Sequence, residues 1–397
     1  MQIDTQTIET LRKAIQTQRL VETAIQLVEI PSPTRDAAAV ADKLAEIMQG
    51  DGFEVERPIA GWEKAPAVVA RYHTGQQGPT LQFNGHLDTV HLQFVPPRVE
   101  NGLLYGSGSS DMKGGIAAAV EAMRALKETG LLQCGSLLLT AHDLHESPWG
   151  DGSQVKALIE AGYLGDAVLL PEYLSTPLPV VGRGLAILSV TITREGEPIH
   201  EVLGGIDQPS VIAAGAEVIR RFGELDQQLK EERTHPMAGR ESLFVGQVAS
   251  GEIYNQAPTE FQLSGTRRWL TGTSIEDVRQ QFHDILQSVS QQTGTQIEGK
   301  FQVSKDAYEL ETEHPAIDAF QSAATVVMGE PLPKGAKPFV DDGNVFIREG
   351  GIPAITHGPD AKGAHTLHEE VSVEELERVA LVYALTAVAF CNASSKT

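Results

Sequence analysis

Cysteine is scarce in the sequence, and this scarcity excludes two architectures. Only Cys134 and Cys391 occur among the 397 residues. A framework of disulfide bonds, or a zinc site built from cysteines, would need more thiols. Both cysteines lie in apolar stretches, where a free cysteine is usually a buried small hydrophobe.

Basic residues are also in short supply, with 31 Lys and Arg against 53 Asp and Glu and a formal net charge of −22. Nucleic acids and anionic membrane surfaces repel such a chain at long range. No apolar run approaches the roughly 18 residues of a membrane helix. The polar segment 1–10 lacks the basic and then apolar pattern of a secretory signal. We therefore expect a cytoplasmic protein without nucleic-acid or membrane partners.

The composition is 41% hydrophobic and 21% charged, as in a globular protein with a sizeable core. Short, uniformly apolar stretches alternate with helical patterns, which is typical of an α/β fold with a largely parallel sheet covered by helices. The strands expected on this ground are 67–72, 80–84, 136–141, 167–170 and 353–356, and the main helices are 114–126, 155–161, 315–328 and 373–391.

The middle of the chain has a different pattern. Residues 185–193 alternate in polarity, as a half-exposed strand does, and further strands are expected at 244–249 and 260–267. Two long helical patterns cover 209–230 and 274–293. We predict a discontinuous catalytic domain, residues 1–182 and 301–397, interrupted by a smaller α+β domain at 183–300.

Titratable residues follow several of the predicted buried strands. His86 and Asp88 end the first of these segments, NGHLD, and His145 and Glu146 end the next, HDLHE. Glu172 follows the strand at 167–170. Ligand sites in open α/β sheets lie beyond the carboxyl ends of the strands. Taken alone, the His-x-Asp pattern of His86 and Asp88 is better explained by a hydrogen-bonded loop histidine than by a functional site.

Two more motifs adjoin helices. Asp111, in GSSDMKGG, precedes the alanine-rich helix, where it would serve as an ordinary N-cap or place two oxygens between two cations. His365 and His368 precede the last helix. Imidazoles and carboxylates gathered at one rim of a sheet would need a cation, and nitrogen and oxygen donors without cysteine suit Zn²⁺, Mn²⁺ or Co²⁺.

In combination these motifs resemble the co-catalytic zinc hydrolases, a family that includes acetylornithine deacetylase, succinyl-diaminopimelate desuccinylase, aminoacylase and the glutamate carboxypeptidases. The similarity lies in the order NGHLD, GSSDMKGG, an acidic pair, a single acid and AH-x-x-x-E, and it extends over nearly the whole chain. It implies a metallohydrolase that cleaves the amide bond of an N-acyl amino acid or a small peptide-like substrate. It also implies a homodimer formed through the inserted domain, which acts as a lid.

The resemblance assigns roles by motif. Two divalent ions, zinc before cobalt or manganese, would be held by His86, Asp111, Glu146, Glu172 and His365, with Asp111 between them. Asp88 would orient His86. His200 of a neighbouring subunit would stabilise the oxyanion, Asn255 would act in the lid, and Arg268, with Arg267 as a competitor, would bind a substrate carboxylate.

One position departs from the family pattern. Asp111 and Glu146 are 35 residues apart (146 − 111), the separation typical of the metal ligand, so His145 stands where the family has a glutamate base. A histidine that takes a proton there becomes cationic beside two cations, which costs Coulomb energy unless a carboxylate such as Asp143 offsets it. His145 or Glu146 would then be the base. The alternative is a homologue with altered chemistry, either deaminase-like or only metal- and ligand-binding.

Overall fold

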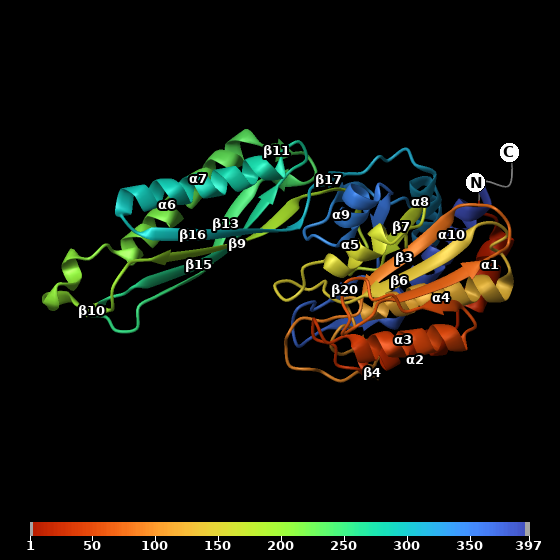
Figure 1. Ribbon diagram of the computed structural model, residues 1–397. Coiled ribbons are helices and arrows are strands. Elements are labelled where there is room, and N and C mark those ends of the chain that lie inside the picture. Colours follow the sequence, from red (N-terminus) through yellow and green to blue (C-terminus); the bar gives the residue numbers. More distant parts are fainter. Residues whose placement is uncertain (1–2, 394–397) are drawn as a thin grey trace. The chain divides into compact units, whose positions relative to one another are not determined.

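The computed structural model describes residues 3–393 (Figure 1). Residues 1–2 and 394–397, which belong to the predicted catalytic segments, lie outside the described part. The chain divides into two compact units. Met1–Val180, Leu310–Lys337 and Asp341–Thr397 form the first, which we call the terminal unit. Val181–Glu309 and Pro338–Val340 form the second, the inserted unit.

The main sheet of the terminal unit has six strands and is parallel in its central part. Its order is β1 (Glu54–Glu56), β2 (Val68–His73), β6 (Ser136–His142), β3 (Thr80–His86), β7 (Ala167–Leu170) and β19 (Ala354–Thr356). The pairs β6–β3, β3–β7 and β7–β19 are parallel, whereas β1–β2 and β2–β6 are antiparallel. Six of the seven residues of β3 and of β6 are buried, as expected of strands in a sheet covered on both faces. The predicted fold class is confirmed.

Helices cover this sheet. They are α1 (Thr5–Ala14), α2 (Thr17–Val28), α3 (Ala38–Gly50), α4 (Lys113–Thr129), α5 (Ser153–Glu160), α8 (Pro315–Met328), α9 (Asp342–Val345) and α10 (Val373–Cys391), with a π-helical turn at Phe346–Gly350. Helix α4 packs on α10, α2 and β3. Its alanine-rich sequence leaves nearly every residue buried, because small side chains let neighbouring elements approach closely.

Two glycines bring the start of α4 against the sheet. A Cβ atom on Gly85 of β3 would lie 2.7 Å from Cγ1 of Ile116, and one on Gly115 would lie 2.1 Å from the carbonyl oxygen of Pro171. Neither position has room for a side chain. The residues just before α4 are therefore held close to the ends of β3 and β7.

Two small sheets lie apart from the main sheet. One has the order β20 (Ala361–Lys362), β21 (Glu370–Ser372), β5 (Leu103–Tyr105) and β4 (Arg98–Glu100), and the other has the order β17 (Tyr308–Glu309), β8 (Leu178–Gly182) and β18 (Lys334–Ala336). Pairing of β21 with β5 brings the segment before α10 beside the loop that precedes α4. The amide of Gly106 donates to the carbonyl of Glu369 at this junction.

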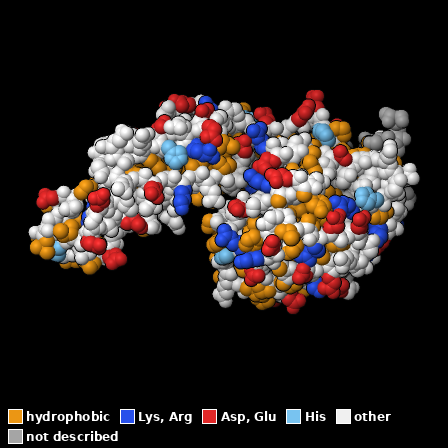
Figure 2. Space-filling view, in the orientation of Figure 1, with side chains coloured by type: hydrophobic (Ala, Val, Ile, Leu, Met, Phe, Trp, Pro, Cys, Tyr) orange, Lys and Arg blue, Asp and Glu red, His pale blue; other side chains and the backbone are white. Residues whose placement is uncertain are grey.

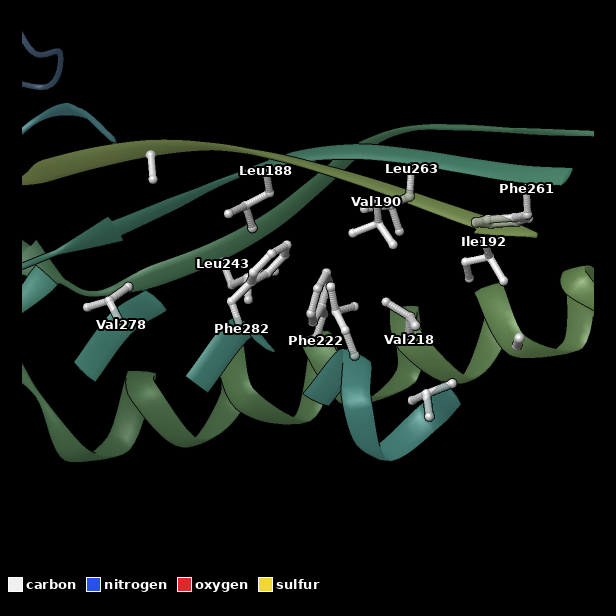
Figure 3. Packing of buried hydrophobic residues seen from close by; sticks show 14 of the residues in the cluster. Leu188, Val190, Ile192, Val218, Phe222, Leu243, Phe261, Leu263, Val278 and Phe282 are labelled. Atoms are coloured by element: carbon white, nitrogen blue, oxygen red, sulfur yellow. The ribbon is translucent and has the colours of Figure 1, made fainter. Parts of the chain in front are cut away.

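The inserted unit is an antiparallel sheet backed by two helices. The strand order is β13 (Ser242–Ser250), β15 (Glu260–Trp269), β9 (Gly184–Thr193) and β16 (Gln296–Lys305), and the helices are α6 (Val211–Glu232) and α7 (Ile275–Thr293). Figure 3 shows Leu188, Val190 and Ile192 of β9 pointing toward the helices. The rings of Phe222 and Phe282 stack there with centroids 5.9 Å apart.

Short elements extend from this sheet. They are β10 (Ile199–His200), the 3₁₀ turns Glu201–Leu203 and Gly205–Asp207, β11 (Thr234–His235), β12 (Gly239–Arg240) and β14 (Gln256–Ala257). Strand β10 pairs with β14 and β11 with β12. Figure 1 places β10 at the end of the unit away from β11.

The predicted boundary at residue 300 differs from the structure. Strand β16 pairs with β9 as far as Lys305, and the inserted unit continues to Glu309. The exposure of β16 alternates, and its outward residues are polar, so the sequence gives no apolar run that would mark a strand there. Between residues 3 and 393, no helix is long and apolar enough to cross a membrane.

Candidate metal centre

The five predicted metal ligands lie at one edge of the main sheet. His86 is the last residue of β3, and Glu172 follows the end of β7 by two residues. Glu146 lies four residues beyond the end of β6. Because these strands are parallel neighbours, their carboxyl ends share one edge. Asp111 arrives from the start of α4, and His365 from the loop between β20 and β21.

Asp111 lies at the middle of this group. Its Oδ1 is 3.1 Å from Nε2 of His86, and its Oδ2 is 3.2 Å from Nε2 of His365. The same nitrogen of His365 lies 3.1 Å from Oε2 of Glu146. One carboxylate thus faces two imidazoles on opposite oxygens, which is the arrangement expected of a ligand shared by two ions.

Donor atoms gather in two overlapping sets. Those of His86, Asp111 and Glu146 lie within 4.8 Å of one another, and so do those of His86, His145 and Glu172. The structure therefore brings together the five residues predicted from the sequence, and adds His145 to them.

Burial makes these charges costly without a cation. His86, Asp111, Glu146 and Glu172 are all buried. Burial, with the charge of Asp111, raises the pKa of Glu172 well above its usual range. Burial opposes ionisation of Asp111 too, but hydrogen bonds with His365 and His86 lower its pKa. A compact, thiol-free set of carboxylates and imidazoles fits a divalent ion such as Zn²⁺, Mn²⁺ or Co²⁺.

Asp88 holds the centre differently from the prediction. Nδ1 of His86 lies 2.9 Å from the main-chain carbonyl oxygen of Asp88 and 3.7 Å from its carboxylate. The carboxylate instead accepts the backbone N–H groups of His145 and Glu146, at 3.1 and 3.0 Å. Asp88 therefore fixes His86 through its carbonyl and fixes the 145–146 segment through its side chain.

His145 is packed inside the centre. Its ring stacks on that of His86, with centroids 4.0 Å apart and planes 6° apart. Nδ1 lies 3.1 Å from Oδ1 of Asp342, and Nε2 lies 4.0 Å from Oε1 of Glu172.

The expectation that Asp143 offsets charge on His145 is wrong. Its carboxylate accepts the backbone N–H groups of Arg35, Ala37 and Leu144 and the indole N–H of Trp62. The carboxylate that faces the imidazole is that of Asp342, which lies 197 residues further along the chain.

Three further residues of the centre were missed from the sequence. Nε2 of His142 lies 2.8 Å from Oδ2 of Asp342. Lys337 is fully buried and pairs with Asp341. Glu369 accepts the hydroxyl of Ser110 and the backbone N–H of Asp111. His142 and Glu369 stand within motifs already noted, HDLHE and AH-x-x-x-E, whereas nothing in the spacing of Lys337 or Asp342 marks them.

The residues assigned to the lid lie in the inserted unit. Nδ2 of Asn255 is 2.9 Å from Nε2 of His200, beside the antiparallel pair β10–β14. Arg268 lies on β15, where burial, with repulsion from Arg183, lowers its pKa. Its competitor Arg267 is buried and bound to Glu241 at 2.6 Å. Arg268 therefore remains the candidate for binding a substrate carboxylate.

A mostly parallel sheet that carries buried imidazoles and carboxylates beyond its strand ends is an arrangement suited to metal-dependent hydrolysis. A model of peptidase family M20/M25/M40 matches residues 82–389. The chain belongs to that family. The family predicted from the motifs, and a hydrolase that cleaves amide bonds, are confirmed.

The similarity to known proteins extends over most of the length of both chains in each comparison. Succinyl-diaminopimelate desuccinylase from Alkalilimnicola ehrlichii is 28% identical over 393 residues, covering 91% of this chain and 96% of that protein. The dipeptidase Dug1p from Saccharomyces cerevisiae has a similar fold, with a TM-score of 0.79 at 13% identity and coverage of 98% and 99%. The Bacillus subtilis YXEP protein, described as a dinuclear metal binding peptidase, has a TM-score of 0.69 at 16% identity and coverage of 96% and 99%.

Proposed function

We propose that this hydrolase removes the acyl group from an N-acyl amino acid or cleaves a small peptide-like substrate. The observation that carries the proposal is the carboxylate of Asp111 held between His86 and His365. The desuccinylase and dipeptidase names of its relatives favour substrates with an amide bond next to a free carboxylate.

We propose two divalent ions, zinc first and cobalt or manganese as alternatives. His86 and Glu172 would hold one ion, His365 and Glu146 the other, and Asp111 both. The dinuclear description of the B. subtilis relative supports this number. When bound, the ions supply Lewis-acid chemistry, in which the pKa of water falls and the substrate carbonyl is polarised.

The chain's own residues handle the proton. As a water oxygen bonds to the carbonyl carbon, His145 or Glu146 accepts the water proton and then delivers it to the leaving nitrogen when the C–N bond breaks. His200 of a second subunit would stabilise the oxyanion. Arg268 would bind the substrate carboxylate, and Asn255 would hold His200 at 2.9 Å.

A homodimer through the inserted unit belongs to this proposal. Phe244 and Val248 of the edge strand β13 are 64% and 55% exposed, which is costly for large apolar side chains in water. The β10 end carries more such residues, and Figure 2 shows hydrophobic side chains gathered there. They are Val202, Leu203, Ile206, Ile253 and Tyr254. The cytoplasmic location expected from the sequence stays a prediction.

A substrate panel tests the proposal. We would assay N-succinyl, N-acetyl and N-formyl amino acids and dipeptides with Zn²⁺, Mn²⁺ or Co²⁺ added to chelator-treated protein. We expect hydrolysis of at least one class, loss of activity on chelation and recovery with metal, and no activity for Asp111→Ala. Turnover that survives chelation, or an active Asp111→Ala variant, would contradict the proposal.

A further inference from the structure

We propose that Asp342 is a positioning residue that acts through His145. It accepts a hydrogen bond from Nδ1 of His145, so that Nε2 faces the metal centre as the acceptor of the water proton. The inference rests on the proposed amide hydrolysis and selects His145 over Glu146 as the base. In this proposal the His145–Asp342 pair takes the role of the general-base glutamate that the family has at position 145.

Hydrogen-bond accounting fixes which nitrogen of His145 carries hydrogen. Nδ1 of His142 lies 2.9 Å from the carbonyl oxygen of Asp143, which can only accept, so that nitrogen bears a hydrogen. Nε2 of His142 lies 2.8 Å from Oδ2 of Asp342, and one hydrogen must lie between them. Whichever atom carries it, Oδ1 of Asp342 remains an acceptor. Nδ1 of His145, 3.1 Å away, is then the donor, and the lone pair of its ring is on Nε2.

Ring geometry argues against His145 as a second imidazole ligand beside His86. An imidazole binds a metal in the plane of its ring. The two rings are stacked with their planes only 6° apart and their centroids separated by 4.0 Å, so these planes do not meet at a nearby point. One ion therefore cannot lie on both lone-pair directions. Nε2 of His145 still reaches the centre, 4.0 Å from Oε1 of Glu172, and is open to a proton.

The pair is held rigidly from both sides. Asp342 is buried at the start of α9, whose first turn is capped by Asp341. Asp341 is fixed in turn by the hydroxyl of Thr356 at 2.6 Å and by Lys337. The backbone of His145 is held by Asp88, and its side chain is 11% exposed. A base held in one orientation before substrate binds loses little entropy during the reaction.

The pair also reduces the Coulomb cost of a histidine base that becomes cationic beside two metal ions. When Nε2 takes the water proton, the ring becomes cationic while the water oxygen bonds to the carbonyl carbon. With the hydrogen of the 2.8 Å contact on Nε2 of His142, Asp342 is a carboxylate and faces that charge through Nδ1, as the carboxylate does in a Ser-His-Asp triad. The proton then passes to the leaving nitrogen as the C–N bond breaks, and His145 returns to its first form. Water is the only co-reactant.

Asp342→Asn tests the inference by kinetics, because a neutral amide cannot balance the positive charge that His145 gains when it takes the water proton. We expect kcat to fall by about 100- to 10,000-fold, with KM and metal content little changed. The matched control is Asp166→Asn, which removes a carboxylate at the other end of the sheet, where it accepts the N–H of Thr80. That variant should keep wild-type kcat.

A second measurement does not depend on activity. In ¹⁵N-histidine-labelled, metal-free protein, long-range ¹H–¹⁵N spectra report which ring nitrogen carries hydrogen. Signals of His145 are assigned by their absence in His145→Gln. We expect hydrogen on Nδ1 in the wild type and mainly on Nε2 in Asp342→Ala, which leaves Nδ1 of His145 without its acceptor. His142 is the internal reference, since its Nδ1 should stay protonated against the Asp143 carbonyl.

The outcomes separate this inference from the proposed function. If the wild type hydrolyses the panel while Asp342→Asn keeps its kcat, the inference is overturned and the function stands. If the metal-loaded wild type hydrolyses nothing, the function fails, and an unchanged His145 tautomer in Asp342→Ala overturns the inference as well. Adding Asp342→Asn to His145→Ala should cost no further activity. A further additive loss would show that Asp342 does not act through His145.

Discussion

Contacts between single residues decide the chemistry of the centre. Asp111 is buried between His86 and His365. Its negative charge favours protonation of both histidines, and their positive charges favour its ionisation. Hydrogen bonds with Asp111 and Glu146 raise the pKa of His365 to about 10. A metal ion bound to the imidazole nitrogens would lie next to the same carboxylate oxygens. The residues that stabilise the protonated histidines are therefore also suited to bind metal.

His357 should make stability depend on pH. Burial, with the nearby charge of Arg378, lowers its pKa to about 3, against 6.5 in the unfolded chain. The unfolded state binds the proton more readily than the folded state. The free energy of unfolding therefore keeps its full value with respect to His357 above pH 6.5 and decreases as the pH falls toward 3. At pH 5 the loss is about 2 kcal/mol.

Denaturant unfolding between pH 4 and 8 measures this effect. His357→Gln keeps an acceptor for the guanidinium of Arg378, which donates to Nε2 of His357 at 2.9 Å, and removes the titration. The variant should lose less stability on acidification than the wild type. Parallel curves for the two proteins would contradict the assignment.

At the residue scale the sequence predicted the motif residues but not their partners. His86 ends a strand, Glu146 follows one and Asp111 precedes a helix, so the sequence indicated both their chemistry and their position. Asp342 was not predictable, because 197 residues separate it from His145 and the contact exists only after folding. Its neighbours, DDGN, are typical of an ordinary helix N-terminus.

At the scale of elements, uniformly apolar strands and glycine contacts position the centre. Strands β6 and β7 were predictable because their sequences are largely apolar on both faces. Strand β3 was predicted from a shorter apolar run, and its second face carries Gln82, Asn84 and His86. Strands β4 and β20 were not, since two or three partly or fully exposed residues have no detectable period. Yet the sheet that contains them places His365 beside the loop before α4. Their position is determined by tertiary pairing.

The core of the inserted unit should be sensitive to cavities. Phe222 is 1% exposed and packs on Phe282 beneath β9 and β15. Phe222→Ala should lower the free energy of unfolding of that unit by about 3–5 kcal/mol. Ile212→Ala, at a residue of α6 that is 49% exposed, is the large-to-small control and should change it by less than about 0.5 kcal/mol. Equal effects in urea titrations would contradict the packing described.

At the scale of the whole chain, both ends contribute to one unit and the middle forms another. In the sequence, this division into two units was indicated by the change from uniformly apolar strands to strands of alternating polarity. The second boundary was misplaced because β16 is polar on its outer face. The arrangement of subunits is a question at this scale too, since the sequence has no feature that identifies an interface, and the exposure of Phe244 and Val248 became visible only in the structure.

The proposed dimer predicts a change in mass. Phe244→Glu places a charge on the exposed edge strand and should shift the protein from dimer toward monomer in sedimentation velocity at micromolar concentration. Ile59→Glu, at a residue of the terminal unit that is 51% exposed, should leave the mass unchanged. A monomeric wild type, or a Phe244→Glu variant that remains dimeric, would contradict the proposed interface.

The central claim is that His86, Asp111, Glu146, Glu172 and His365 bind divalent ions together. Elemental analysis of the purified chain, equilibrated with Zn²⁺ and freed of excess metal, tests it most directly. We predict two ions per wild-type chain and less than one in Asp111→Ala, with the circular dichroism spectrum unchanged. A folded wild type that holds no metal, or an Asp111→Ala variant that binds as much as the wild type, would contradict the account.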